Sequence, residues 1–311
     1  MTKKSCCKYF DILAARKVYA EGKNVTDFLR AQKQVSHNTI EIIETAYDLQ
    51  AGTYIEHAQK NQAWAHAFTG ELAAVLDRHI GDQSSMLDVG TGEMTTLDLV
   101  VLALSNKPRK IFAFDISWSR MHKGLAYVKD RLANDRHQLI PFVADMREIP
   151  LPDKSISVTT SSHALEPNGA ELPALMTELF RITRDKLVLT EPCYEINTEE
   201  GKRRMDKLGY IKDLDGVVRA LGGTMLEKVR IQNPHNPLNP AVCFVIEPPP
   251  TAIAPAATSN AALFSVPGTN LPLRKVDDFY FSDDTGLCFP VLKAIPILKS
   301  DTAILASSLI E

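Results

Sequence analysis

The feature that most constrains the fold is an alternation of short β-branched runs with amphipathic stretches between residues 82 and 248. This alternation is typical of βα units on a mostly parallel sheet. Five compact apolar runs suit strands that are buried on both faces: 85–89, 110–115, 139–144, 155–160 and 186–190. The stretches between them carry apolar residues at helical spacing, and the predicted helices are 94–104, 119–133 and 170–183.

The chain continues the pattern after the fifth run. A predicted helix over 213–221 ends at Gly222-Gly223, and two further β-like runs follow at 224–231 and 241–246. The segment 233–240 between those runs is too long and too rich in proline for a tight hairpin turn. Seven strands are therefore available for one α/β sheet.

Four regions follow from this pattern. Residues 1–65 are expected to form a helical cap over the sheet, and residues 66–247 the sheet domain itself. Residues 248–270 form a Pro/Ala-rich linker, because such segments favour extended polyproline II. A short β-rich tail, 271–311, completes the chain.

Composition excludes several classes of protein. The 311 residues include 35 Lys and Arg against 38 Asp and Glu, a net charge of −3, which gives no global argument for a nucleic-acid or membrane partner. No apolar region follows the basic N-terminus, and no window approaches the roughly 20 apolar residues of a membrane span, so a cytoplasmic location is expected. Five scattered cysteines, Cys6 and Cys7 among them, form no C-x-x-C pair, so reduced thiols and no metal site are expected.

The most informative segment runs from Met86 to Thr96, where a strand enters a glycine-rich turn and then a helix. Gly90 and Gly92, on either side of Thr91, lack a Cβ atom, so the backbone can turn sharply and approach a ligand. A tight βα turn without a ligand is the alternative interpretation.

Three successive predicted strands each present an acid near the carboxyl end: Asp88, Asp115 and Asp145. Ligands of open α/β sheets bind at this edge, so the three side chains should converge on one crevice. An acid after the second strand can accept two hydrogen bonds from ribose hydroxyl groups. A nicotinamide or flavin domain shares this feature, but its G-x-G-x-x-G pattern fails because Thr95 stands at the third glycine.

These motifs resemble class I S-adenosylmethionine-dependent methyltransferases, whose Rossmann-like sheet has seven strands with the last one antiparallel. The resemblance covers about residues 64–247 and is carried by 87–92, 114–117, 143–153 and 161–166. It implies S-adenosylmethionine as cofactor, with Asp88 and the turn at the methionine end, Asp115 at the ribose and Met146 at the adenine. The implied cofactor-binding residues are Tyr54, Asp88, Gly90, Thr91, Gly92, Asp115, Ile116, Asp145, Met146 and Ser161.

The turn departs from the family pattern in one place. Family members often read G-x-G-x-G, but Met94 replaces the third glycine here, so the turn should differ slightly. Glu93 beside it has two interpretations: attraction of the ligand's ammonium or sulfonium charge, or a first-turn acid stabilised by the dipole of the following helix.

The acceptor side is expected at the ends of the fourth and fifth strands. His163 is the candidate general base, and Glu166 and Glu191 are candidates for orienting an amine or hydroxyl group. A hydrogen-bonded loop histidine and helix-capping or ion-paired glutamates are the alternatives. Tyr47 and Tyr54 lie where related methyltransferases carry a cap over the cofactor, although packing of an amphipathic helix explains them as well.

The tail carries a second resemblance. Residues 279–298 are similar to the small zinc-ribbon activator subunits of methyltransferases through a G-x-x-[FY]-P-[IV]-x-x-x-I-P core. The metal-binding cysteines of that family are absent and Cys288 stands alone, so zinc is not expected. The segment is expected to pack on the methyltransferase domain in cis or on a neighbouring chain.

The predicted function is methyl transfer by in-line displacement to an oxygen or nitrogen of a small-molecule or sugar-like acceptor. His163 and Glu166 are the predicted catalytic residues, and a homodimer through the cap or the tail is considered. The charge balance argues against a nucleic-acid acceptor. The alternative is a non-catalytic methyltransferase-like subunit that binds cofactor and assembles with a partner.

Overall fold

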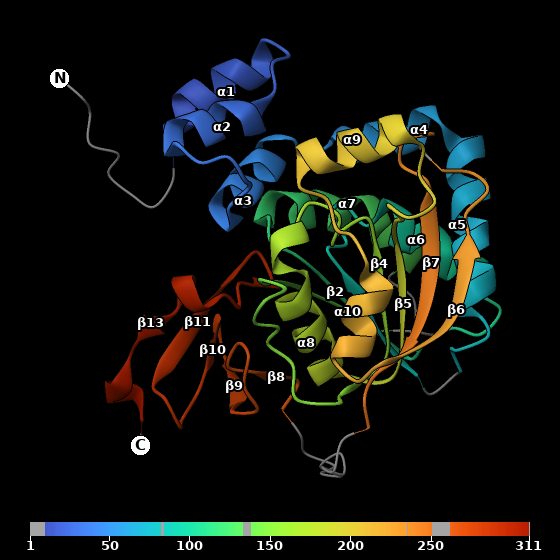
Figure 1. Cartoon of the computed structure of the whole chain (residues 1–311). Helices are drawn as coiled ribbons and strands as arrows, with labels where there is room; N and C mark the ends of the chain where they lie inside the picture. The colour runs from blue at the N-terminus through green and yellow to red at the C-terminus, as the bar shows by residue number, and fades with distance from the viewer. Residues whose placement is uncertain (1–9, 82–83, 133–137, 235, 251–261, 311) are drawn as a thin grey trace.

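The computed structural model describes residues 10–81, 84–132, 138–234, 236–250 and 262–310. Its main sheet has seven strands in the order β3-β2-β1-β4-β5-β7-β6 (Figure 1). β7 runs antiparallel to the other six strands of this sheet, which confirms the predicted Rossmann-like methyltransferase topology. The strands are β1 Ser85–Val89, β2 Lys110–Asp115, β3 Gln138–Val143, β4 Ile156–Ser162, β5 Thr183–Pro192, β6 Thr224–Arg230 and β7 Ala241–Glu247.

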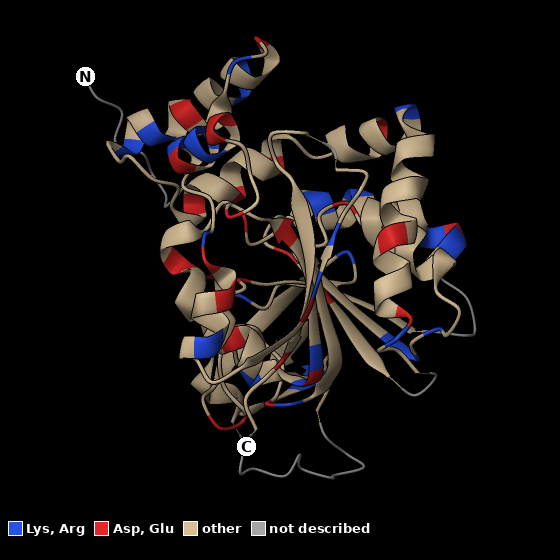
Figure 2. Cartoon of the chain, turned by 45° about the vertical axis from the view of Figure 1, so that its right-hand side comes forward, with Lys and Arg blue, Asp and Glu red and all other residues tan. Residues whose placement is uncertain are grey.

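Helices cover both faces of this sheet because its strands present apolar side chains on each side. One face packs against α5 (Gln62–Leu76), α6 (Thr95–Ala103) and α7 (Trp118–Leu132). The other packs against α8 (Leu172–Ile182) and α10 (Leu214–Ala220). Figure 2 shows that the charged residues lie mainly on helices and loops, whereas the strands carry few of them. The core therefore consists of two apolar layers that the sheet separates.

One further helix, α9 (Glu199–Leu208), lies outside the predicted helices and consists mostly of charged residues. Its apolar content is small, so periodicity gives little signal. The Thr198 hydroxyl accepts a hydrogen bond from the backbone N–H of Gly201 at 3.1 Å, and Met205 is fully buried. A capping residue and one buried anchor hold this helix in place.

The N-terminal cap consists of α1 (Ile12–Ala20), α2 (Val25–Lys33), α3 (Ile40–Leu49) and α4 (Thr53–Lys60). The first three helices share a small core of their own: Ala15, Val25, Leu29, Ile42 and Ala46. The expected boundary at residue 65 lies inside α5, which packs on the sheet. The cap and the sheet domain are thus joined through one continuous helix.

The tail folds into a small sheet of its own that packs on the same chain, beside β3 (Figure 1). Its strands are β8 Phe264–Ser265, β9 Pro272–Val276, β10 Phe279–Phe281, β11 Leu287–Leu292, β12 Ile295–Pro296 and β13 Ile304–Leu305. Val143 at the end of β3 forms a parallel bridge with Ile297, and its carbonyl accepts the N–H of Leu298 at 2.8 Å. The buried Phe264 contacts Phe142 edge-on, with 5.2 Å between ring centroids.

Other expectations fall partly outside the described residues. The expected linker contains β8, while its residues 251–261, like Cys6 and Cys7, lie outside the described part of the chain. Within the described residues, no helix is both long and apolar enough to cross a membrane.

Candidate functional site

The glycine turn after β1 is tightly fixed. Gly90 and Gly92 have φ angles of 63° and 57°, in the left-handed region that favours glycine. A Cβ atom on Gly90 would overlap the side chain of Ala164. The Gly92 N–H donates to Oδ2 of Asp115 at 3.0 Å, so the carboxylate at the end of β2 holds the turn directly.

The position of the missing third glycine is occupied by a strained residue. Met94 adopts φ 58° and is fully buried at the N-terminus of α6. Its backbone therefore takes the left-handed conformation that glycine would take there, while its side chain fills the core. Met94 thus combines a backbone conformation that favours glycine with a side chain that packs beneath the turn.

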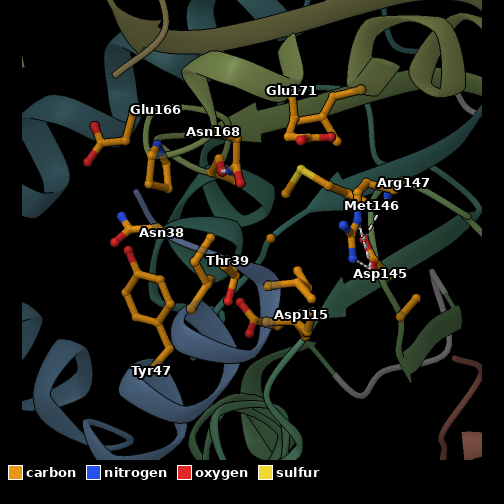
Figure 3. A pocket seen from close by; sticks show the side chains of 18 of the residues that line it. Asn38, Thr39, Tyr47, Asp115, Asp145, Met146, Arg147, Glu166, Asn168 and Glu171 are labelled. Atoms are coloured by element: carbon orange, nitrogen blue, oxygen red, sulfur yellow. Dashed lines mark hydrogen bonds and ion pairs between the residues drawn. The ribbon is translucent and has the colours of Figure 1, made fainter. Parts of the chain in front are cut away.

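A cavity of about 420 Å³ lies at the carboxyl ends of the strands, between the cap and the sheet. Figure 3 shows Thr39 and Tyr47 of the cap on one side, with Asn168 and Glu166 opposite them. Its volume falls within the range of about 300–1,000 Å³ typical of small-molecule sites. Six of the predicted cofactor-binding residues line it: Tyr54, Gly90, Asp115, Ile116, Asp145 and Met146.

The other four predicted cofactor-binding residues stand behind the cavity wall: Asp88, Thr91, Gly92 and Ser161. The Thr91 N–H donates to the Phe114 carbonyl at 2.9 Å. Asp88 is buried at the end of β1, and this burial raises the pKa of its carboxyl group from 3.8 to about 7. The Ser161 hydroxyl donates to Glu191 at 2.5 Å and is fully buried.

The third strand end carries an ion pair. Arg147 donates from Nη2 to Oδ2 of Asp145 at 2.6 Å and from Nε to both carboxylate oxygens at 3.1 Å (Figure 3). Met146 between them also lines the cavity. The Asp145 charge is thus partly balanced before any ligand binds, and the thioether offers an apolar contact.

The two predicted catalytic residues contact one another at the opposite end of the cavity. Nδ1 of His163 lies 2.9 Å from Oε2 of Glu166. Burial alone would lower the pKa of His163, but the hydrogen bond and the charge of Glu166 raise it above 6.5. His163 itself has φ 59°, which places it on a sharp turn after β4.

Glu191 at the end of β5 supports this turn. Its carboxylate accepts the N–H groups of Leu165 at 3.2 Å and Glu166 at 3.1 Å, in addition to the Ser161 hydroxyl. Burial raises the pKa of Glu191 to about 7. Neither Glu166 nor Glu191 pairs with Arg181, which instead binds Asp153 and Glu178.

Glu93 makes contacts that neither sequence interpretation describes. Its Oε1 accepts the N–H of Gly52 and its Oε2 the N–H of Ile55, each at 2.9 Å. These are N-terminal amides of α4, so the acid caps a helix of the cap and not the helix that follows it in sequence. Glu93 therefore fastens the cap to the glycine turn.

Two residues near the site were missed by the sequence analysis: Arg120 and Tyr210. Arg120 lines the cavity from α7. Tyr210 lies beside Glu166, and Asn239 donates to Oε2 of Glu166 at 3.2 Å. A signal existed for Arg120, because it lies four residues before Gly124 and eight before Val128 on the buried stripe of its helix.

The sheet order, the glycine turn and the acids at the strand ends define a nucleoside-binding, Rossmann-like class of domain. Residues 87–188 match a family model described as Methyltransferase domain. Together, the match and the sheet order identify this part of the chain as a class I S-adenosylmethionine-dependent methyltransferase domain, and they indicate S-adenosylmethionine as its cofactor.

Solved structures are similar in fold at low identity. One is a complex between the Haloferax volcanii Trm112 methyltransferase activator and a protein described as a methyltransferase, with 14% identity, a TM-score of 0.51, and 65% of this chain and 97% of that chain covered. Another is magnesium protoporphyrin IX methyltransferase from Synechocystis PCC 6803, with 13% identity, a TM-score of 0.46 and coverages of 76% and 99%. No curated protein matches the chain.

Proposed function

We propose that the chain transfers a methyl group from S-adenosylmethionine to an oxygen or nitrogen atom of a small-molecule acceptor. One observation carries this proposal: a single cavity extends from the acids at the strand ends to His163 and Glu166 beneath the cap. The bound cofactor supplies a methyl group activated by a sulfonium centre. The protein's contributions to such a transfer are proximity, alignment and removal of the acceptor's proton.

The residues present fit the cofactor. The turn is built from glycines that allow close approach, Asp115 can still accept ribose hydrogen bonds, and Met146 offers an apolar contact to the base.

His163 is suited to act as the general base. With Glu166 ionised, the Nδ1 hydrogen of His163 donates to the carboxylate across 2.9 Å, which leaves Nε2 to accept a proton. The bond also fixes the orientation of the ring. The acceptor's hydroxyl or amine would therefore lose its proton to Nε2 as the methyl group is transferred.

The size of the cavity supports a small acceptor. The cofactor and the acceptor must share about 420 Å³ under a cap that Glu93 fastens in place. A partly open cavity of that size suits a metabolite beside the cofactor better than a polymer segment. Polar groups at the His163 end of the cavity, among them Glu166 and Asn168, can orient it (Figure 3).

Calorimetry tests cofactor binding with S-adenosylmethionine and its demethylated product. We expect saturable binding by the wild type, and a loss of about 1–3 kcal/mol for Asp115→Ala, which removes charge-assisted hydrogen bonds. Asp283→Ala on the exposed tail surface, 58% accessible at its side chain, is the control. Absence of binding by the wild type would refute the enzyme proposal.

Turnover is tested with methyl-labelled cofactor and fractionated metabolite extract. Glu166→Gln should lower turnover and shift the rising limb of its pH profile to lower pH, because removal of the Glu166 charge lowers the pKa of His163. An unchanged pH profile would exclude His163 as the base.

A second candidate function is a non-catalytic subunit that binds cofactor and assembles with a partner. One similar fold comes from a complex with a methyltransferase activator, and the tail of this chain resembles activators in sequence. Cofactor binding without turnover, together with co-purification of an active partner, would favour this candidate. Turnover by the isolated chain would exclude it.

A further inference from the structure

Arg120 is a buried cation inside the cofactor cavity. It projects from α7 with only 7% of its surface exposed and lines the cavity next to the glycine turn. A Cβ atom placed on Gly92 would lie 2.5 Å from Nη2 of Arg120 and 2.9 Å from Cζ. The guanidinium group therefore lies directly against the turn.

Two cap tyrosines enclose the guanidinium group. The Cζ atom of Arg120 lies 4.9 Å from the ring centroid of Tyr47 and 4.5 Å from that of Tyr54. Aromatic faces attract a cation and hold a planar guanidinium group in a defined orientation. The side chain is thus positioned before any ligand binds.

One donor of this group, Nε, is not satisfied by the described residues. Its nearest acids are Asp115, 3.6 Å from Nη1, and Glu93, 3.8 Å from Nε, both beyond hydrogen-bond distance. Nε is buried without any hydrogen-bond partner in the described part of the chain. A buried arginine donor without a hydrogen bond is costly unless a ligand completes it.

Both neighbouring acids are already engaged elsewhere. Asp115 accepts the backbone N–H groups of Gly92 and Ser117, and Glu93 accepts those of Gly52 and Ile55. These acids balance the charge of Arg120 at longer range but do not bind its N–H groups. The guanidinium group, with Nε unfilled and both acids beyond hydrogen-bond distance, therefore fits a further planar anion that enters from the cavity.

We propose that Arg120 binds the carboxylate of the cofactor's amino-acid end. This inference rests on the proposed function, because it takes S-adenosylmethionine as the ligand. Arg147, the other arginine that lines the cavity, lies at the end of β3 and is already paired with Asp145. Lys33 of the cap also lines the cavity, and it is paired with Glu41 at 2.7 Å. The cofactor has one carboxylate, and Arg120 beside the turn carries a donor, Nε, that has no hydrogen-bond partner among the described residues.

Calorimetry with two cofactor forms tests the proposal: S-adenosylmethionine and decarboxylated S-adenosylmethionine, which lacks only that carboxylate. The wild type should bind the first about 30-fold more tightly, as expected for loss of a charge-assisted pair. Arg120→Met should reduce this ratio to nearly one. Arg120→Lys keeps the charge but not the planar fork, so it should give an intermediate ratio.

The ratio separates binding from a purely structural role. If Arg120 only neutralises buried acids, R120M weakens both ligands equally and the ratio stays at the wild-type value, which overturns the proposal. Arg147→Met is the matched control, and it should keep the wild-type ratio. If R120M does not fold, an R120K ratio equal to that of the wild type overturns the proposal by itself. Failure of the wild type to bind either form would instead refute the proposed function.

Discussion

Nζ of Lys299 lies 2.7 Å from Oε1 of Glu44, which joins the tail to the cap across 255 positions of the chain. The two side chains are only 5% and 16% exposed, so the pair is shielded from solvent. The helix that carries Glu44 borders the cofactor cavity, and the tail pairs with the end of β3. Their attachment to each other helps to fix the cap over the sheet. Through this ion pair, the tail helps to position the cap that covers the cavity.

Lys299→Met should lower the free energy of unfolding by about 3 kcal/mol, because it leaves the Glu44 carboxylate buried without its cation. Urea denaturation measures this loss, and the double variant with Glu44→Gln should recover part of it. Lys202→Met is the control, since its partner Glu199 is 78% exposed and such pairs contribute less than about 1 kcal/mol. Equal losses for the two lysine variants would contradict the expectation.

Glu93→Gln should loosen the cap without unfolding the sheet. One of the two N–H groups that Glu93 accepts, from Gly52 and Ile55, would then face an amide NH₂ group. A hydrogen bond to a charged group contributes about 1.5–3 kcal/mol, so exchange of these two amides should accelerate roughly tenfold or more. Hydrogen exchange measures it, with Glu56→Gln, 69% exposed on the same helix, as control. Unchanged exchange rates would show that Glu93 does not hold the cap.

Asp88→Asn should remove one component of the pH dependence of stability. Burial raises the pKa of Asp88 from 3.8 to about 7, so between about pH 4 and 7 the folded state holds a proton that the unfolded state has released. This contribution to stability therefore falls as the pH rises, by about 1.4 kcal/mol per pH unit.

Urea unfolding of the wild type and of Asp88→Asn at pH 5, 6, 7 and 8 measures this effect. The stability of the variant relative to the wild type should rise up to about pH 7 and then level off. Asp185→Asn, at a side chain that is 50% exposed, controls for the general effect of losing a carboxylate. A difference for Asp88→Asn that does not change with pH would contradict the assignment.

Gly90→Ala should abolish measurable cofactor binding. Its φ angle of 63° disfavours a side chain, and the added methyl group would overlap Ala164 at the cavity wall. Gly70→Ala is a matched control within α5, where a Cβ atom meets nothing within 4 Å, and it should stabilise the fold by up to about 1 kcal/mol. Calorimetry and thermal unfolding of both variants check these outcomes, and retained binding by G90A would rule out close approach of the ligand at this turn.

The sheet could be predicted because its central strands are buried on both faces. The predicted ranges 85–89 and 110–115 agree with β1 and β2 at both ends, whereas β5 extends from Thr183 to Pro192, beyond the predicted 186–190. The residues added at its start, 183–185, follow α8 without a loop, and those added at its end, 191–192, pair with β7. Neither relation has a local sequence signal.

The site was only partly predictable, because some of its contacts join segments that are far apart in the sequence. Acids at strand ends follow from the topology, so Asp115 and Asp145 could be assigned to one cavity. The partners of Glu93 and Arg120 come from the cap, whose placement depends on tertiary contacts between segments far apart in sequence. Periodicity along one helix cannot show that a tyrosine from another covers an arginine.

The tail's attachment at β3 also determines how this chain can meet others. An edge strand with free N–H and C=O groups is a template for another strand. Here the end of β3 is paired with Ile297 and Leu298 of the same chain. A protein that adds a strand at that position must first displace the tail, and the break would also separate Lys299 from the cap. Binding of another strand at this edge would thus weaken the attachment of the cap that covers the cofactor cavity.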